Sequence, residues 1–287
     1  MSIVVIGSIN IDLVTEAKNF PQKGETIVGN SFHTFFGGKG ANQAVCAARL
    51  GIDVQFIGCV GDDINGVEAI TNLSNNNIDV TAIRTIDDVS TGVAQITIAE
   101  DDNSIIIVKG ANDYVTKDII DENLDIILRA ELVLLQLEIP LKTVEYIIDI
   151  CHKNGIRTVL NPAPAVKLSN EILDKVTYIT PNETEYDFLF NGNYTEGLER
   201  YPNKLIVTQG ANGVDYYNGE EIVTIKAHKV DVVDTTGAGD SFNAALCVGI
   251  VKRMSLSEAI SFGNKVASYS IKKLGAQTSM PYLTEIE

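Results

Sequence analysis

Hydrophobic residues along this chain fall into short continuous runs, and amphipathic helical patterns lie between several of them. The clearest helical pattern runs from Pro140 to Asn154 and is followed by Gly155 as a C-terminal cap. Strands that alternate with helices predict a three-layer α/β/α fold whose mostly parallel central sheet is covered on both faces. We expect buried strands at six runs: Ile3–Ile6, Val54–Val60, Leu132–Leu137, Thr158–Leu160, Tyr178–Thr180 and Leu205–Thr208.

Two stretches break this alternation. Residues Ile11–Ala17 with Thr26–Phe35, and Gly92–Ala99 with Ser104–Val108, predict strands that have no helix between them. These strands either form a small second sheet that projects from the main one, or they are edge strands of a single sheet. The pattern alone leaves both arrangements open.

Charge and composition narrow the range of partners. The formal net charge of −16 argues against nucleic acid or an anionic membrane as a partner, because both require a basic surface. It does not exclude a phosphate-bearing ligand, which backbone N–H groups and helix N-termini can hold locally. The four cysteines form no C-x-x-C pair, which indicates reduced thiols and no zinc site. The apolar N-terminus has no basic region before it, and no apolar run approaches the ~20 residues of a membrane span. We therefore expect a soluble, cytoplasmic protein.

The first motif with chemical content is Gly-Gly-Lys-Gly-Ala-Asn at residues 37–42, followed by a helical pattern through Leu50. Glycines before a helix let the backbone approach a ligand, and the helix N-terminus favours anionic or oxygen-rich groups. A simple turn that leads into a helix explains the same pattern.

The second motif is Asp-Thr-Thr-Gly-Ala-Gly-Asp at residues 234–240, which opens a helix predicted to reach about Lys252. Small residues here leave several N–H groups free at the positive end of the helix dipole, where they can stabilise a transferring phosphoryl group. A carboxylate at Asp240 can accept a proton from an attacking hydroxyl. Ordinary helix capping is the alternative, but a cap does not require Gly-Ala-Gly between two aspartates. The chain contains no Walker A motif, and its first strand is not followed by G-x-G-x-x-G.

Together the two motifs resemble the two signatures of the ribokinase (PfkB) family of carbohydrate kinases, and they occur in the family's order. The resemblance spans essentially the whole chain and implies one kinase domain over residues 1–287, with a small β-sheet lid inserted at about residues 11–36 and 91–108. It implies ATP-dependent phosphorylation of a sugar, with ribose phosphorylated at its 5-hydroxyl, and Mg2+ and an activating K+ as cofactors. It also implies a homodimer formed through the lid.

The resemblance further implies a sugar site and a catalytic base. Asp240 would be the base, and the N–H groups of Gly237, Ala238 and Gly239 would form an anion hole. Glu138 follows a predicted strand, where an α/β site is expected, although an exposed acid near the next helix is an alternative. The implied sugar-binding residues are Asn10, Asp12, Gly38, Lys39, Asn42, Glu138 and Asp240.

Nucleotide and cation sites are implied in the same way. Asn182 and Glu185 match an N-x-x-E motif linked to Mg2+ and phosphate, but a capping box explains the same spacing. Asn264 matches an adenine-side position and would otherwise be unremarkable on a helix. The implied nucleotide-binding residues are Asn182, Thr208, Gln209, Gly210, Ala211, Asn212, Gly213, Gly239, Asp240 and Asn264. The implied ligands of a monovalent cation are Asp234, Thr236, Ser270, Lys273, Gly275 and Ser279.

Other functions are compatible with parts of this pattern. Family members that act on deoxyribose, fructose, phosphorylated sugars or nucleosides are the nearest alternatives, and a phosphosugar would need cationic side chains beyond Lys39. A non-catalytic sugar-binding regulator on the same fold is disfavoured by Asp240 and the intact Gly-Ala-Gly run. A dinucleotide-dependent oxidoreductase is disfavoured by the missing glycine fingerprint.

Overall fold

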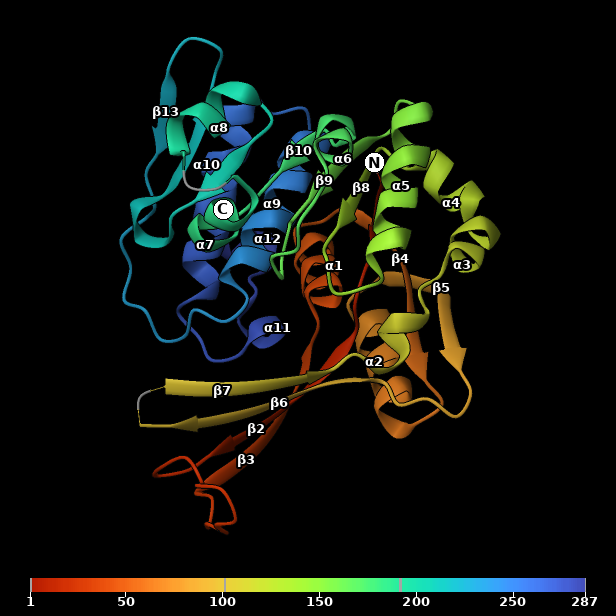
Figure 1. The fold of residues 1–287 in the computed structure, drawn as a ribbon, viewed down its shortest axis with the longest axis vertical. Helices are drawn as coiled ribbons and strands as arrows, with labels where there is room; N and C mark the ends of the chain where they lie inside the picture. Colours follow the sequence, from red (N-terminus) through yellow and green to blue (C-terminus); the bar gives the residue numbers. More distant parts are fainter. Residues whose placement is uncertain (1, 101, 191–192, 287) are drawn as a thin grey trace.

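A six-stranded parallel sheet forms the centre of the molecule, with strand order β10-β9-β8-β1-β4-β5 (Figure 1). The computed structural model describes residues 2–100, 102–190 and 193–286. The strands of this sheet are β1 (Ser2–Ile6), β4 (Asp53–Gly61), β5 (Ile78–Ile86), β8 (Leu132–Leu135), β9 (Arg157–Leu160) and β10 (Tyr178–Ile179). The predicted α/β/α architecture is thereby confirmed.

Both faces of this sheet are buried, as strand β1 illustrates. Ile3 and Val5 point into one hydrophobic core, whereas Val4 and Ile6 point into the other. Because neighbouring side chains alternate between faces, a strand with a core on each side becomes a continuous apolar run.

Helices supply the outer layers. The first core is closed by α1 (Lys39–Arg49), α2 (Ile64–Asn75), α9 (Ala238–Val251), α10 (Leu256–Ser270) and α12 (Leu283–Ile286). The second is closed by α3 (Lys117–Glu122), α4 (Leu124–Arg129), α5 (Leu141–Lys153), α6 (Asn170–Lys175), α7 (Glu183–Phe190) and α8 (Tyr194–Arg200). Helix α5 matches the predicted segment, with Pro140 and Asn154 as its caps and Gly155 in the left-handed region at φ 69°. Within the described part of the chain, no helix is long and apolar enough to cross a membrane.

A separate four-stranded sheet, here called the lid sheet, has the order β3-β2-β6-β7 and projects from the main body (Figure 1). It contains β2 (Asn10–Glu16), β3 (Ser31–Gly37), β6 (Gly92–Ala99) and β7 (Asp102–Val108). Of the two arrangements that the sequence left open, the structure therefore has the second sheet. Strand β3 begins later than the predicted Thr26 because β2 ends at Glu16, opposite Ser31, and leaves earlier residues without a strand to pair with.

Three strands form a third, antiparallel sheet: β11 (Ile206–Thr208), β12 (Val214–Tyr217) and β13 (Ile222–Ile225). The predicted strand at Leu205–Thr208 thus belongs to this sheet, although isolated bridges from Ile179 to Leu205 and from Asn182 to Thr208 run parallel alongside β10. Short 3-10 turns η1 (Gly110–Tyr114) and η2 (Gly210–Asn212) and helix α11 (Ala276–Ser279) complete the elements described.

Candidate active site

The loop after β1 and the start of α1 pack backbone against backbone. Gly38 precedes α1 with φ 86°, and a Cβ atom built on it would lie 2.7 Å from the backbone nitrogen of Asn10. A Cβ on Gly40 would lie 2.6 Å from the nitrogen of Ser8, and the N–H of Ala41 donates to the carbonyl of Ser8 at 2.9 Å. Only glycine permits this approach, so Gly38 and Gly40 are required by backbone packing, and ligand binding by the first motif stays a prediction.

Polar side chains from three segments meet beside this junction. Glu138 accepts hydrogen bonds from the Ser8 hydroxyl and, at 3.0 Å, from the N–H of Lys39. The predicted strand was expected to reach Leu137, but β8 ends at Leu135, and the chain from Gln136 onward turns toward α1. Glu138 is therefore anchored in the site and is not an exposed acid beside α5.

Asn10 and Asp12 lie at the base of the lid sheet. The Oδ1 atom of Asn10 accepts a hydrogen bond of 2.8 Å from Asn112, whose amide also bonds both backbone groups of Ile9. A Cβ atom on Gly37 would lie 2.3 Å from a carboxylate oxygen of Asp12, so any side chain at this position would displace that carboxylate. Burial, reinforced by Glu138 and Asp240, raises the pKa of Asp12 to about 7.

Asp240 lies in the first turn of α9 and is almost fully buried. Its Oδ2 atom accepts a hydrogen bond from the Asn42 amide and its Oδ1 atom one from the Gln43 amide, both at 2.9 Å. Burial raises the pKa of Asp240, and Lys39 and the two amides oppose that rise. Burial acts to lower the pKa of Lys39, but the surrounding carboxylates outweigh it and the net shift is upward. The cluster thus holds several carboxylates around one ammonium group.

The N-terminus of α9 opens beside Asp240. Gly237 precedes the helix in the left-handed conformation, with φ 76°, and a Cβ atom on it would lie 3.1 Å from Ala276. A Cβ atom on Gly239 would meet no heavy atom within 4 Å, so a ligand can approach its backbone. The first N–H groups of a helix have no intrahelical acceptor. The N–H group of Ala238 nevertheless donates to the carbonyl of Thr235 at 3.1 Å, so of the predicted anion-hole donors those of Gly237 and Gly239 are the ones that suit an anion here.

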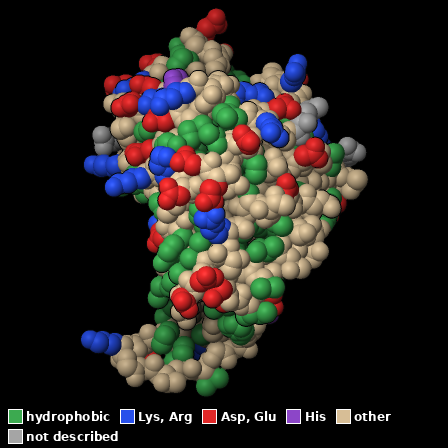
Figure 2. Space-filling view, turned by 90° about the vertical axis from the view of Figure 1, so that its right-hand side faces the viewer, with side chains coloured by type: hydrophobic (Ala, Val, Ile, Leu, Met, Phe, Trp, Pro, Cys, Tyr) green, Lys and Arg blue, Asp and Glu red, His purple; other side chains and the backbone are tan. Residues whose placement is uncertain are grey.

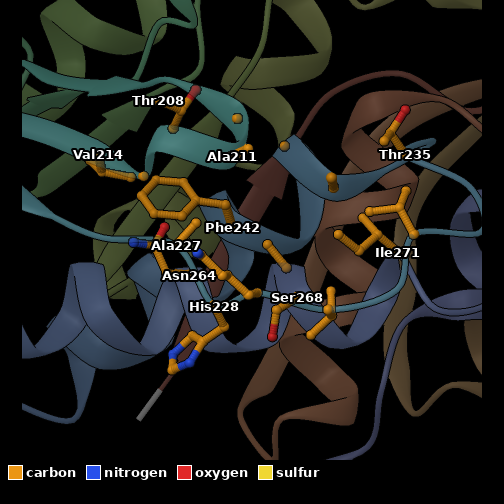
Figure 3. Close-up of a pocket in the computed structure, with 18 residues that line it drawn as sticks. Thr208, Ala211, Val214, Ala227, His228, Thr235, Phe242, Asn264, Ser268 and Ile271 are labelled. Atoms are coloured by element: carbon orange, nitrogen blue, oxygen red, sulfur yellow. The ribbon is translucent and has the colours of Figure 1, made fainter.

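A cavity of about 600 Å3 begins at this helix end and runs between α10 and the third sheet (Figure 3). Six of the predicted nucleotide residues line it: Thr208, Gly210, Ala211, Gly213, Gly239 and Asn264. Asn264 donates to the carbonyl of Ile225 at 2.9 Å and so fixes the strand end beside the cavity. The other walls of the cavity were not predicted from the sequence. They include Phe242, Ala227, His228, Val230, Val232 and Ile271.

The remaining predicted nucleotide residues lie outside that lining. Gln209 donates to the Asp215 carboxylate at 2.9 Å. The backbone N–H of Asn182 donates to Glu185, and the N–H of Glu185 donates to Asn182 Oδ1 at 2.8 Å, so the capping box is formed. Glu185 is nonetheless buried, which raises its pKa, while Lys39 counteracts that shift. The capping interpretation of the N-x-x-E spacing is therefore confirmed, and the link of Glu185 to Mg2+ stays a prediction.

The segments predicted to hold a monovalent cation are joined by Asp234. One carboxylate oxygen accepts hydrogen bonds from the backbone and hydroxyl of Thr236, at 2.9 and 2.6 Å. The other accepts from the N–H of Gly275 at 2.8 Å. Ser270 and Ser279 are buried and donate to backbone carbonyls, whereas the exposed Lys273 pairs with Glu285 at 3.1 Å.

Comparisons with known proteins agree with this geometry. The family model for pfkB family carbohydrate kinases matches residues 1–283. The chain belongs to this family. It is a carbohydrate kinase, with the fold and the phosphoryl-transfer chemistry that the motifs predicted.

Similar proteins cover this PfkB-family kinase along nearly its whole length. A ribokinase from Bacillus subtilis (strain 168) is 45% identical over 287 residues, which is 100% of this chain and 98% of the relative. A deoxyribokinase from Salmonella typhimurium is 35% identical over 297 residues, which is 99% of this chain and 97% of the relative. The structure of Arabidopsis thaliana ribokinase complexed with ribose and ATP is similar to this one, with a TM-score of 0.89 and 31% sequence identity. The match covers 99% of this chain and 96% of the Arabidopsis chain.

Proposed function

We propose that this kinase phosphorylates D-ribose at its 5-hydroxyl, giving ribose 5-phosphate and ADP. The observation that carries the proposal is the place of Asp240, between the polar cluster at Asn10, Asp12 and Glu138 and the cavity that begins at Gly239. Carboxylates and amides suit the hydroxyl groups of a free sugar. Among the relatives, two proteins named ribokinase are each 45% identical to this chain.

The reaction follows from these positions. Asp240 takes the proton of the sugar hydroxyl while that oxygen attacks the γ-phosphorus of ATP in line, and the bond from this phosphorus to the ADP oxygen breaks. The N–H groups at Gly237 and Gly239 stabilise the negative charge on the transferring phosphoryl group, and that of Ala238 holds the loop through the carbonyl of Thr235. Lys39 balances the carboxylates around the sugar. Asn42 holds Asp240 through its amide, and Asn42 and Gly38 would contact the sugar, as the family resemblance implies.

ATP would occupy the cavity lined by Thr208, Gly213 and Asn264. Mg2+ bound with ATP neutralises charge on its phosphates, and the buried carboxylate of Glu185 is the group that would take part in holding it. K+ would be held by Asp234, Thr236 and the segment from Ser270 to Ser279. What supports such an ion is that Asp234 joins its own loop to Gly275 and so brings the two segments together.

We further propose that the chain acts as one kinase unit in which the lid sheet closes over the sugar, and that two lids pair in a homodimer. Strand β7 supports this, because it is an edge strand and is exposed along its length. A cytoplasmic location accords with four buried, free cysteines.

The test is a coupled assay of ADP release with Mg·ATP and ribose, deoxyribose, fructose, fructose 6-phosphate or adenosine. We expect the highest kcat/KM with ribose and a product phosphorylated at the 5-position by 31P NMR. A higher kcat/KM with deoxyribose, the substrate class of the relatives named deoxyribokinase, would reassign the sugar. Ribose binding by calorimetry without transfer to any acceptor would favour a sugar-binding regulator.

A further inference from the structure

The amide of Asn42 has a fixed direction, and that direction matters to Asp240. Its Nδ2 group donates to Asp240 at 2.9 Å, so its oxygen must face the other way. That oxygen accepts a hydrogen bond of 3.1 Å from the Nε2 group of Gln277. Only 6% of Asn42 and 5% of Gln277 is exposed, so water has little access to replace this partner.

Gln277 is itself oriented by a further amide. Its Oε1 atom accepts a hydrogen bond of 2.7 Å from Asn72. The hydrogen bonds therefore form a one-way chain. The NH2 group of Asn72 donates to Gln277, that of Gln277 donates to Asn42, and that of Asn42 donates to Asp240. The four residues belong to α2, α11, α1 and α9. Turning any one amide over would place two acceptors or two donors opposite each other.

The backbone at Gln277 is held against the same helix that carries Asn42. Arg49, on α1, donates to the carbonyls of Gln277 and Met280 at 2.5 and 2.9 Å. At the other end of this short segment, Gly275 donates to Asp234. Gln277 thus projects from a braced segment.

We propose that Gln277 is a positioning residue of the transfer reaction: it fixes the Asn42 amide with its NH2 group toward Asp240 and so orients the carboxylate that takes the sugar proton. The inference rests on the proposed function, because it assigns Asp240 as the base. Gln43 fixes the other carboxylate oxygen, and it is oriented in turn by Gln136, which donates to its oxygen at 2.6 Å. Without Gln277 only one of the two carboxylate oxygens keeps an oriented donor.

The experiment compares Gln277→Glu with Gln277→Met. A glutamate carboxylate can still accept from Asn72 but cannot donate to Asn42, so Asn42 would turn its NH2 group toward the new carboxylate and its oxygen toward Asp240. Methionine removes the donor without adding an acceptor of that strength. We expect kcat to fall about 100-fold in Gln277→Glu and about tenfold in Gln277→Met, in line with the cost of a small misplacement. The KM for ATP should not change, because Gln277 does not line the nucleotide cavity.

Gln55→Glu is the matched control. Gln55 donates to the carboxylate of Asp79 at 3.0 Å, between β4 and β5 and away from Asp240. This variant puts two carboxylates together as well, so it measures the effect of lost stability alone. Its kcat should equal that of the wild-type enzyme even if its Tm falls.

Two results would overturn the role of Gln277: wild-type kcat in both folded variants, or a loss in Gln277→Glu no larger than in Gln277→Met. If Gln277→Glu does not fold, the tenfold loss of kcat in Gln277→Met carries the test, and an unchanged kcat there refutes it. All assays use whichever sugar the wild-type enzyme phosphorylates fastest. If the preferred substrate is not ribose, the assignment of ribose is wrong. The role of Gln277 is then still decided by the kcat of these variants with the preferred sugar.

Discussion

Asp240 combines near-complete burial with three groups that favour its charged form. Burial raises the pKa of its carboxyl group, while Lys39, Asn42 and Gln43 act in the opposite direction. A general base works best when its pKa lies near the working pH, since it must be ionised and still attract a proton. The hydrogen bonds leave the carboxylate oriented at the start of α9, where the reacting hydroxyl and the phosphate would meet.

Replacing Asp240 with Asn should therefore remove turnover and leave binding largely intact. The amide keeps the size of the carboxylate but cannot take the proton, so we expect kcat to fall roughly 10²–10⁴-fold. Steady-state kinetics measure the loss, and calorimetry with ribose and with ATP measures binding. A loss smaller than about tenfold would show that Asp240 is not the base.

Asp12 gives a prediction on stability and pH. Burial and two nearby carboxylates raise its pKa from 3.8 to about 7 in the folded protein. The folded state then holds the proton more tightly than the unfolded state, so this stabilisation is complete below about pH 4 and is lost as the pH rises through about 7. We expect Asp12→Asn to have a higher Tm than the wild type at about pH 8, with the gap closing near pH 4. Thermal unfolding followed by circular dichroism checks this, and an equal gap at both pH values would contradict the raised pKa.

The same Asp12→Asn variant should bind ribose more weakly if Asp12 accepts hydrogen bonds from the sugar. The Tm at about pH 8 would then rise while the affinity for ribose falls. A general packing defect would lower both. Calorimetric titration with ribose, with ATP as the reference ligand, separates the two effects.

Individual residues could be predicted from the sequence where they belong to a local motif. Residues that act through contacts with distant parts of the chain could not. Asn42 and Asp240 could be predicted from the residue pattern because each lies in a glycine-rich helix start. Gln277 lies in a segment whose resemblance pointed only to cation ligands, and Asn112 has no local signal. The two reach Asn42 and Asn10 only because the chain returns to the site. Gln43 is an intermediate case, since its place directly after Asn42 in the motif was the only available sign.

At the scale of elements, the start of α9 depends on the segment that ends in α11. Asp234 joins the two by its hydrogen bond to Gly275, and Gly237 packs against Ala276. The N–H groups of Gly237, Ala238 and Gly239 are therefore held by contacts with the C-terminal segment as well as by α9. Any ion that tightens these segments would preorganise the donors aimed at the phosphate.

We expect K+ to raise kcat or kcat/KM, Na+ to substitute poorly, and the response to weaken in Asp234→Ala. A cage of oxygen atoms sized for K+ fits the smaller, more strongly hydrated Na+ less well. Initial rates should be measured against KCl and NaCl at constant ionic strength, because screening alone affects so acidic a protein. The same flat response to both salts in the wild type would rule out the cation site.

Strands were predicted well where both of their faces are buried, because every position is then apolar. The runs at Ile3–Ile6 and Val54–Val60 lie between two cores and became central strands. Strand β5 was missed because it lies at the sheet edge, and its exposed positions carry polar residues such as Thr81 and Arg84. A strand with one side open loses the continuous apolar run that makes a central strand recognisable.

For the whole molecule, the lid sheet is the least self-contained part. The register places Ile105 and Ile107 of β7 on the same face as Ile96 of β6 and Asp12 of β2, because paired residues in a sheet share a face. Ile105 is 51% exposed and Ile107 50% exposed, so this apolar face is only partly covered. Figure 2 shows hydrophobic side chains over the lower part of the molecule, where Figure 1 places the lid sheet.

The opposite face of the lid sheet carries the polar Gln95 and Ser104, together with exposed apolar side chains of its own: Phe32 (60%), Ile106 (63%) and Val108 (53%). The two faces are distinguished by Asp12, which lies only on the face of Ile105 and Ile107. An edge strand with uncovered apolar residues is a site for pairing with another chain. We therefore expect a second copy of this chain to cover the face that carries Ile105 and Ile107, next to Asp12, which we propose to bind the sugar.

The two faces can be tested separately with Ile105→Lys and Ile106→Lys. A lysine at position 105 would place an unpaired ammonium group in the proposed interface, so we expect sedimentation velocity to show a monomer. The same change at position 106 adds the same charge to the same strand on the other face and should leave the dimer intact. Because Asp12 lies on the covered face, Ile105→Lys should also raise the KM for ribose more than the KM for ATP. A monomeric wild-type protein, or equal effects of the two lysines, would show that this face of the lid is not the interface.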